Sequence, residues 1–396
     1  MTTMTKWSVV KDDSGEKRRR ELMPRIALLA CLALVVASLG PGWSPGRPKE
    51  PAEPPFSEQA RSAALTETLR LRAAGEQLGS STAGDPQPAV ARTVSLLTSH
   101  SRALLVPGQD APAAPASPGF ATAAAPSAVR SGVPSAVPSA VPLPASAAAL
   151  ATELAASASQ RLADAAVADG GMARLLAAVG TAQLLQASSL AAAVGAPAPA
   201  VPDPAAPQLS GACPSAAPAS PSSGSSSGSI PGFSAGADAA AASLPGALAA
   251  TVETELETVY GYQVALTRLG GPAAGPASEQ LARHEALAAG AEELSRMHCA
   301  PVPPRAAGYT MAPAFLASPA AGLGGLEASA LPVYGDLVAL SEGQTRQWAI
   351  AGLVGAARRS ALWGADTGVL PGLAADPNQF PELPAPAPAP AVTPTP

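Results

Sequence analysis

Proline, glycine and serine are concentrated in separate tracts of this chain, and this distribution constrains its fold more than any other feature. The tracts leave two long blocks rich in alanine and leucine, at residues 57–195 and 241–371. Proline interrupts helical hydrogen bonding, and Ser/Gly-rich segments bury too little apolar surface to order themselves. The blocks show helical spacing, and no run resembles a strand. The sequence predicts an all-α protein with two Ala-rich helical bundles joined by disordered Pro/Ser/Ala-rich linkers.

The tracts also place the boundaries between domains. Small alanine side chains favour closely packed helices, and four helices are expected in each bundle. The predicted segments are an N-terminal export signal or membrane anchor (1–40), a Pro-rich linker (41–56), a helical bundle (57–195) with a disordered insertion (107–144), a disordered linker (196–240), a second helical domain (241–371) and a Pro/Ala-rich disordered tail (372–396). The predicted helices span 57–78, 88–105, 146–168 and 172–194 in the first bundle, and 245–269, 277–297, 325–340 and 344–363 in the second.

The N-terminal segment has the features of an export signal. Basic residues ending at Arg25 precede the 14-residue apolar run Ile26 to Leu39. Because a bilayer-spanning helix needs about 20 residues, a cleaved signal is favoured. The small residues near Ser38 offer a cleavage point. An uncleaved anchor extending towards Trp43 is the alternative to cleavage. Arg19 and Arg20 also resemble a twin-arginine signal, but an ordinary charged n-region is favoured over it. Either way, the chain is expected outside the cytoplasm, secreted or attached to the cell envelope.

Charge and cysteine usage narrow the possible functions. Without residues 1–40, which carry seven basic and four acidic side chains, the formal charge is about −8. No basic cluster with interleaved aromatic residues remains after Arg25, which excludes nucleic-acid binding. Outside the cytoplasm, Cys213 and Cys299 are permitted to form a disulfide, with two independent thiols as the alternative.

The C-terminal block resembles DUF4439, an uncharacterised ferritin-like domain family common in actinobacterial envelope proteins. The resemblance covers about residues 244–371 and implies a ferritin-like four-helix bundle. Two positions differ: the family often has Glu-His where this chain has Glu255-Leu256, and its basic cluster after the second-helix histidine is replaced by residues 285–289. The matching residues are Glu255, Tyr260-Gly261-Tyr262, His284, Leu326-Glu327, Tyr334-Gly335-Asp336-Leu337-Val338 and Arg346 through Trp363. Residues 57–195 are similar to the helical region that precedes this domain in relatives.

A ferritin-like fold suggests a di-iron centre, and the sequence argues against one. Such centres need two Glu-x-x-His pairs, because residues i and i+3 share a helix face and can chelate one metal. The chain has no Glu-x-x-His pair. It also has no His-Glu-x-x-His, Cys-x-x-Cys or phosphate-binding loop motif. We therefore assign no catalytic residue, no metal ligand and no cofactor.

One polar contact is nevertheless expected in the core of the second bundle. Glu255 lies three residues after Val252 and four before Val259, and His284 has the same relation to Leu281 and Ala288. This spacing turns both side chains inward, where a buried carboxylate needs a partner. Tyr262 and Tyr334 are candidates to join this pair. The pair is interpreted as a core hydrogen bond, with a ligand or mononuclear metal site as the alternative. Arg358 and Arg359 are expected to be exposed near a helix end, with a partner-binding patch as the alternative.

These observations favour a non-enzymatic, exported envelope protein that acts as a binding or structural helical module. It would contact the membrane through its N-terminal segment if that segment is retained, and its protein or envelope partner is not indicated. The alternative is a divergent metal-binding or oxidoreductase ferritin-like domain. A small-molecule-binding bundle is a third hypothesis.

Overall fold

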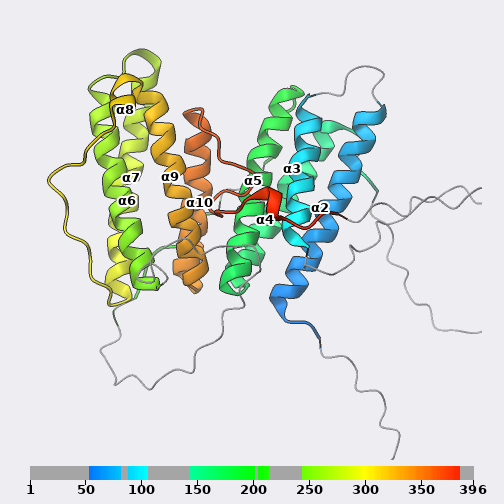
Figure 1. Ribbon diagram of the computed structural model, residues 1–396, viewed down its shortest axis with the longest axis horizontal. Helices are drawn as coiled ribbons and strands as arrows, with labels where there is room; N and C mark the ends of the chain where they lie inside the picture. Colours follow the sequence, from blue (N-terminus) through cyan, green and yellow to red (C-terminus); the bar gives the residue numbers. More distant parts are fainter. Residues whose placement is uncertain are drawn as a thin grey trace, which may run out of the picture. The chain divides into compact units, whose positions relative to one another are not determined.

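The computed structural model describes residues 53–81, 88–105, 142–200, 204–211, 213 and 243–383. All regular structure in these residues is helical, so the protein is all-α (Figure 1). The expected export signal or anchor at 1–40 and most of the expected insertion, interdomain linker and C-terminal tail lie outside the described residues. The helices form two groups that follow the two Ala/Leu-rich blocks of the sequence.

The first group has the four helices expected from its sequence. Two of them begin at side-chain caps: Ser146 Oγ accepts a hydrogen bond from Ala149 N at 3.1 Å, and Asp169 Oδ1 accepts one from Met172 N at 3.3 Å. Helices α4 and α5 form an antiparallel hairpin against which α2 and α3 pack. The helices are α2 (Phe56–Ser81), α3 (Pro88–Leu104), α4 (Ala147–Val167) and α5 (Gly170–Ala193).

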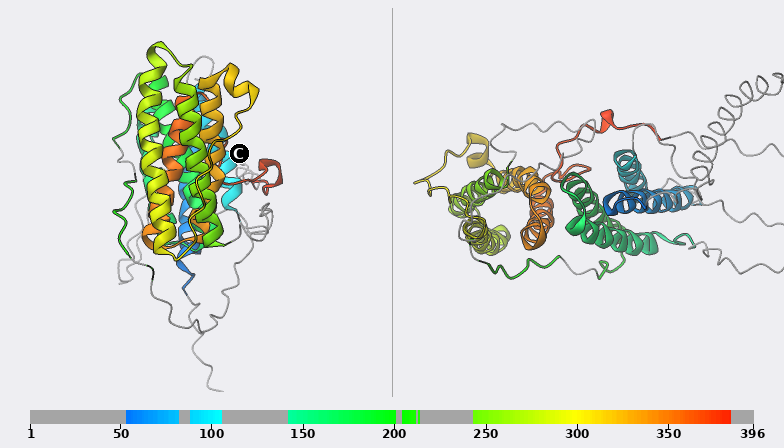
Figure 2. Two further views of the ribbon diagram at one scale, coloured as in Figure 1. Left: turned by 90° about the vertical axis from the view of Figure 1, so that its left-hand side faces the viewer. Right: turned by 90° about the horizontal axis from the view of Figure 1, so that it is seen from below.

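The second group is a four-helix bundle. Helix α6 contacts α7 and α9, and α9 contacts α10; the right-hand view of Figure 2 shows these helices end-on. The bundle helices are α6 (Leu244–Leu266), α7 (Ala274–Met297), α9 (Pro319–Leu340) and α10 (Gly343–Leu362). The short helix α8 (Pro313–Ala317) and the 3-10 turn η2 (Gly271–Ala273) lie in the connections. Most helix ends fall within three residues of the expected ones, but α9 begins six residues before the expected 325.

The two groups of helices pack against one another, which the sequence left open. Helix α5 contacts α9 and α10, and α4 contacts α10. The approach at the start of α5 is so close that a Cβ at Gly170 would stand 2.2 Å from the carbonyl oxygen of Ala339. Arg174 of α5 forms an ion pair with Asp336 of α9 at 2.5 Å, and Arg346 of α10 donates to the Ala168 carbonyl. The two halves therefore share one contact surface.

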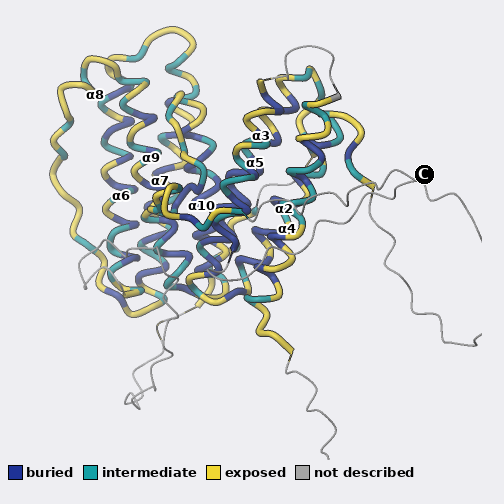
Figure 3. Tube along the Cα trace, turned by 45° about the vertical axis from the view of Figure 1, so that its right-hand side comes forward, coloured by how far each residue is buried: buried dark blue, intermediate teal, exposed yellow. Residues whose placement is uncertain are grey.

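Helix α5 is the one helix in the described part of the chain that is long and apolar enough to cross a membrane. Of its most apolar 18-residue window, 72% is buried within the protein. Figure 3 shows the general pattern: buried and exposed residues alternate along the helices, as they do when each helix has one buried face. The burial of α5 on several sides explains its apolar sequence as that of a core helix.

The segment after α10 is a strap that ties the two halves together. We use the name strap for residues 364–383, which include the 3-10 turn η3 (Pro377–Gln379). His100 Nε2 donates to the Val369 carbonyl at 2.8 Å, and Arg102 Nη2 donates to the Phe380 carbonyl at 2.8 Å. The expected disordered tail begins at residue 372, whereas residues 372–383 are packed in this strap.

Candidate functional site

The core of the second bundle contains the pair of side chains that helical spacing placed there. Glu255 on α6 and His284 on α7 are both fully buried. Nδ1 of His284 lies 2.7 Å from Oε2 of Glu255. The two residues therefore form a direct polar contact inside the bundle.

A second carboxylate lies on the opposite side of the imidazole. Nε2 of His284 is 2.8 Å from Oε1 of Glu327, a fully buried residue of α9. Arg359 of α10 donates from Nε to the other oxygen of Glu327 at 2.8 Å. One charged side chain from each bundle helix thus contributes to a single cluster. We call Glu255, His284, Glu327 and Arg359 the charge network.

Two buried tyrosines complete the hydrogen bonding of the carboxylates. Tyr334 donates to Oε1 of Glu255 at 2.6 Å, and Tyr262 donates to Oε1 of Glu327 at 2.7 Å. The Tyr262 ring is stacked on the His284 ring, with 5.1 Å between centroids, and Trp363 Nε1 donates to the Tyr262 hydroxyl at 2.7 Å. Each carboxylate oxygen of both glutamates therefore accepts at least one hydrogen bond.

This geometry determines the charge of His284. A carboxylate oxygen accepts and does not donate, so an imidazole between two carboxylates must carry a proton on each nitrogen. Burial by itself lowers the pKa of His284, but the hydrogen bonds to Glu255 and Glu327 raise that pKa above its ordinary value. Burial raises the pKa of Glu327, but the hydrogen bond from His284 and the charge of Arg359 lower it overall. With His284 as an imidazolium, the charge network has no net charge.

Helical spacing in the sequence predicts Glu255 and His284 as members of this network but not the other two. Glu327 was noted only within the family resemblance, and Arg359 was expected to be exposed together with Arg358. That expectation is wrong for Arg359, which is 7% exposed. The signal was present in the spacing of α10, since Trp348, Gly352, Gly355, Arg359 and Trp363 recur at intervals of three or four residues. Arg358 is half-buried and lies outside the network.

The network does not fit a metal ion in this arrangement. Metal ligation by histidine requires a ring nitrogen with a free lone pair, and both nitrogens of His284 face carboxylates. One oxygen of Glu327 is bonded to the guanidinium of Arg359. Across the residues that the structure describes, no group of three or more His, Cys, Asp or Glu could hold a metal ion. The donors that a metal would need are occupied by internal hydrogen bonds.

The charge network lies in the part of the chain that matches a known protein family. Residues 247–375 match the family model described as a domain of unknown function, DUF4439. The C-terminal third of the chain is thus a DUF4439 domain, and it contains the whole charge network and the start of the strap. No curated protein and no solved structure matches the chain.

The structure joins Cys213 and Cys299 in a disulfide, with their Cα atoms 5.2 Å apart. Cys299 follows the end of α7 in the DUF4439 domain, and Cys213 belongs to the segment expected to be a linker. Beside the disulfide, Gln344 Nε2 donates to the Ser210 carbonyl at 2.6 Å. The segment before Cys213 is therefore fastened to the outside of the DUF4439 domain, away from the charge network.

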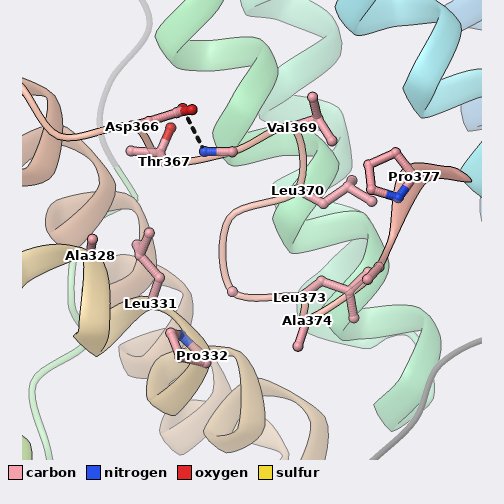
Figure 4. A pocket seen from close by; sticks show the side chains of 13 residues that line it. Ala328, Leu331, Pro332, Asp366, Thr367, Val369, Leu370, Leu373, Ala374 and Pro377 are labelled. Atoms are coloured by element: carbon pink, nitrogen blue, oxygen red, sulfur yellow. Dashed lines mark hydrogen bonds between the residues drawn. The ribbon is translucent and has the colours of Figure 1, made fainter.

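A pocket of about 460 Å³ lies between α9 and the strap. Figure 4 shows this lining, with Leu331 and Pro332 on α9 and Val369 and Leu370 on the strap. The one ionisable side chain of the lining, Asp366, accepts a hydrogen bond from the Gly368 backbone N–H at 2.9 Å. The side chains that line the pocket are mostly apolar, and the polar ones are the Asp366 carboxylate and the Thr367 hydroxyl.

Proposed function

We propose that the protein is an exported cell-envelope protein that acts as a non-enzymatic binding or structural module, with a degenerate ferritin-like domain. The charge network is the observation that carries this proposal. Its residues occupy the core where a ferritin-like domain would do chemistry, yet Glu255, His284 and Glu327 are fully buried and bonded to one another. A catalytic group must reach a substrate, and these three groups are bonded to one another and to neighbouring side chains of the same core.

Two features support a location outside the cytoplasm. The sequence begins with a basic stretch and an apolar run typical of export signals. The Cys213–Cys299 disulfide is stable in an oxidising compartment and is rare in the cytosol. Both features favour a chain that is secreted or held at the envelope, with the membrane as a contact if the N-terminal segment is retained.

Metal analysis tests the non-enzymatic part of the proposal. The purified full-length chain and a Glu255→Ala variant would be compared by elemental analysis after dialysis against iron and manganese. We expect no stoichiometric metal in either protein. Iron or manganese bound at one or two per chain and lost in the variant would overturn the proposal in favour of a metal-dependent domain.

Cell fractionation tests the location. A C-terminally tagged full-length chain and a version lacking residues 1–40 would be expressed in a bacterial host. We expect the full-length chain in the envelope or the medium with Cys213 and Cys299 oxidised, and the shortened chain in the cytoplasm. A full-length chain found in the cytoplasm with both thiols free contradicts export. The mass of the exported chain then shows whether the N-terminal segment has been removed.

The pocket favours one further candidate, small-molecule binding. Its volume of about 460 Å³ lies within the range of ligand sites, and its lining is mostly apolar. A thermal-shift screen of apolar compounds tests this function, because a ligand that binds only the folded chain raises its Tm. Replacing Ala328 in the lining by Phe would fill the pocket and should abolish any such shift.

A further inference from the structure

The pocket between α9 and the strap is preformed, because several contacts fix the strap. Arg174 of α5 donates from Nε to the Gly372 carbonyl at 2.8 Å, and His100 of α3 donates to the Val369 carbonyl. A Cβ at Gly335 of α9 would stand 1.9 Å from the Gly372 carbonyl oxygen, so the strap and the helix are in direct backbone contact. Both Val369 and Gly372 line the pocket. A ligand would therefore bind without first having to order the strap.

The side chains of the lining carry one charge, and it is negative. The thirteen lining residues include one carboxylate, Asp366, and no lysine, arginine or histidine. Oδ1 of Asp366 accepts a hydrogen bond from the Gly368 N–H at 2.9 Å, which leaves Oδ2 as an acceptor. Within the part of the chain that the structure describes, Asp366 forms no ion pair. Arg174, which contacts the strap, has Asp336 as its ion-pair partner. The charge of Asp366 is thus open to a cation from outside.

Pro332 adds a second acceptor to the same pocket. It lies inside α9, and a proline has no N–H to donate to the carbonyl four residues earlier. That carbonyl belongs to Ala328, which also lines the pocket. The Ala328 carbonyl therefore lacks its regular helical hydrogen bond where the helix borders the pocket. An N–H of a ligand can supply the missing donor.

We infer that this pocket binds an organic ammonium, with its apolar body against Leu331 and Leu370 and its charge at the Asp366 carboxylate and the Ala328 carbonyl. The inference rests on the small-molecule binding proposed for the pocket and names the class of the ligand. Apolar walls alone accept any compound of suitable size. A carboxylate without a cationic partner beside those walls favours a cation and disfavours an anion.

Three compounds with the same apolar body test the charge of the ligand: the ammonium aminoadamantane, the alcohol adamantanol and the anion adamantanecarboxylate. Ligand-observed NMR would give the Kd of each for the full-length chain. We expect the ammonium to bind about three- to fivefold more tightly than the alcohol, the effect of one exposed ion pair, and the carboxylate to bind most weakly. Added salt should reduce this preference, because it screens exposed charges. Phenylethylammonium and phenylethanol repeat the comparison with an elongated body.

The Asp366→Asn variant tests the carboxylate. It removes the charge and keeps an oxygen that can accept from the Gly368 N–H. Asp376→Asn is the matched control, because Oδ1 of Asp376 makes the same bond to the N–H of Asn378, also at 2.9 Å, and Asp376 is not part of the lining. We expect the preference for the ammonium over the alcohol to disappear in Asp366→Asn and to persist in Asp376→Asn.

Two variants of α9 test the helix side of the pocket. Pro332→Ala restores an N–H for the Ala328 carbonyl. Because this variant also loses apolar contact, its readout is the ratio of the Kd of the alcohol to that of the ammonium, which we expect to fall. Ala328→Phe fills the pocket and should abolish binding of all compounds. Circular dichroism of each variant shows whether it is folded.

Several results would overturn the inference. Equal Kd values for ammonium and alcohol in both series, or an Asp366→Asn variant that keeps the native preference, reject it and leave small-molecule binding intact. Binding that survives in a folded Ala328→Phe lies outside the pocket and also rejects it. An unchanged ratio in Pro332→Ala rejects the role of the Ala328 carbonyl. A native chain that binds none of these compounds rejects the inference, and small-molecule binding fails with it only if the thermal-shift screen finds no ligand either.

Discussion

Tyr334 of α9 lies so close to Gly352 of α10 that a Cβ at residue 352 would stand 2.1 Å from Cε1 of the tyrosine ring. Real Cβ atoms do not approach other heavy atoms this closely, so only glycine fits at residue 352 while Tyr334 keeps its place. The same tyrosine donates to Glu255 at 2.6 Å. The absence of a side chain on α10 thus allows a hydrogen bond to the charge network.

Gly352→Ala is therefore expected to destabilise the protein by about 1–3 kcal/mol, because the added methyl group must displace a buried ring. Gly325→Ala in α9 is the control, since a Cβ there meets no atom within 4 Å. That change should be neutral or stabilise by up to about 1 kcal/mol through helix propensity. Urea unfolding of both variants checks this, and equal effects would contradict the packing described.

Tyr334→Phe removes a single hydroxyl from the network. The Oε1 atom of Glu255 then loses its donor in a buried site, and we expect a loss of about 1–3 kcal/mol in the free energy of unfolding. Tyr309→Phe serves as control, because Tyr309 is only partly buried and lies outside the charge network. If Tyr334→Phe lowers the free energy of unfolding by less than about 0.5 kcal/mol, the hydroxyl contributes little to stability.

His284 is expected to carry a proton on each ring nitrogen at pH values above its ordinary pKa of 6.5. Its pKa is raised in the folded state by Glu255 and Glu327, so its stabilising effect is complete below the ordinary pKa of 6.5. That effect decreases as the pH rises through the higher folded value. NMR of the ring nitrogens at pH 7 checks the protonation state directly. A ring nitrogen without a proton at pH 7 would be incompatible with two ionised carboxylates beside it.

His100 should produce the opposite pH dependence. Burial lowers its pKa from 6.5 to about 4, and its bond to the Val369 carbonyl offsets this in part. The folded state therefore resists protonation, and stability present above pH 6.5 should fall by about 3 kcal/mol as the pH decreases towards 4. His100→Gln keeps a donor for the Val369 carbonyl and cannot titrate. Between pH 7 and pH 4, the free energy of unfolding of this variant should decrease less than that of the native chain.

Removal of the Cys213–Cys299 disulfide should lower stability without disturbing the charge network. The two cysteines are 86 residues apart in sequence, and closing a loop of this size stabilises a fold by roughly 2–5 kcal/mol in chain-entropy models. The double variant Cys213→Ser/Cys299→Ser should lose this amount in urea, and reductant should affect the native chain but not the variant. No change of the native chain on reduction would mean that the bond contributes nothing to folding stability.

The sequence predicts the helices well because Ala/Leu spacing and Pro/Gly interruptions are local signals. The exception is the start of α9, which begins at Pro319, six residues before the expected start at residue 325. Proline is favoured in the first turn of a helix, where its missing N–H has no partner to lose. A high proline content therefore does not distinguish the first turn of a helix from a linker.

The site was predictable only in part, for a related reason. Glu255 and His284 lie in regular apolar stripes, so their inward direction follows from sequence. Glu327 lies beside three glycines at 322, 324 and 325, where no apolar stripe marks the buried face. The contacts of the strap could not be predicted at all, because the acceptors at Val369 and Phe380 are backbone carbonyls that every residue possesses.

The fastening of Cys213 to Cys299 also changes what the serine-rich stretch after it can do to the molecule. Because Cys213 precedes that stretch and Cys299 lies beyond it, a protease that cuts anywhere between Pro214 and Ala242 produces two polypeptides that remain covalently joined. A cut in this stretch therefore opens the chain without releasing either half of the protein.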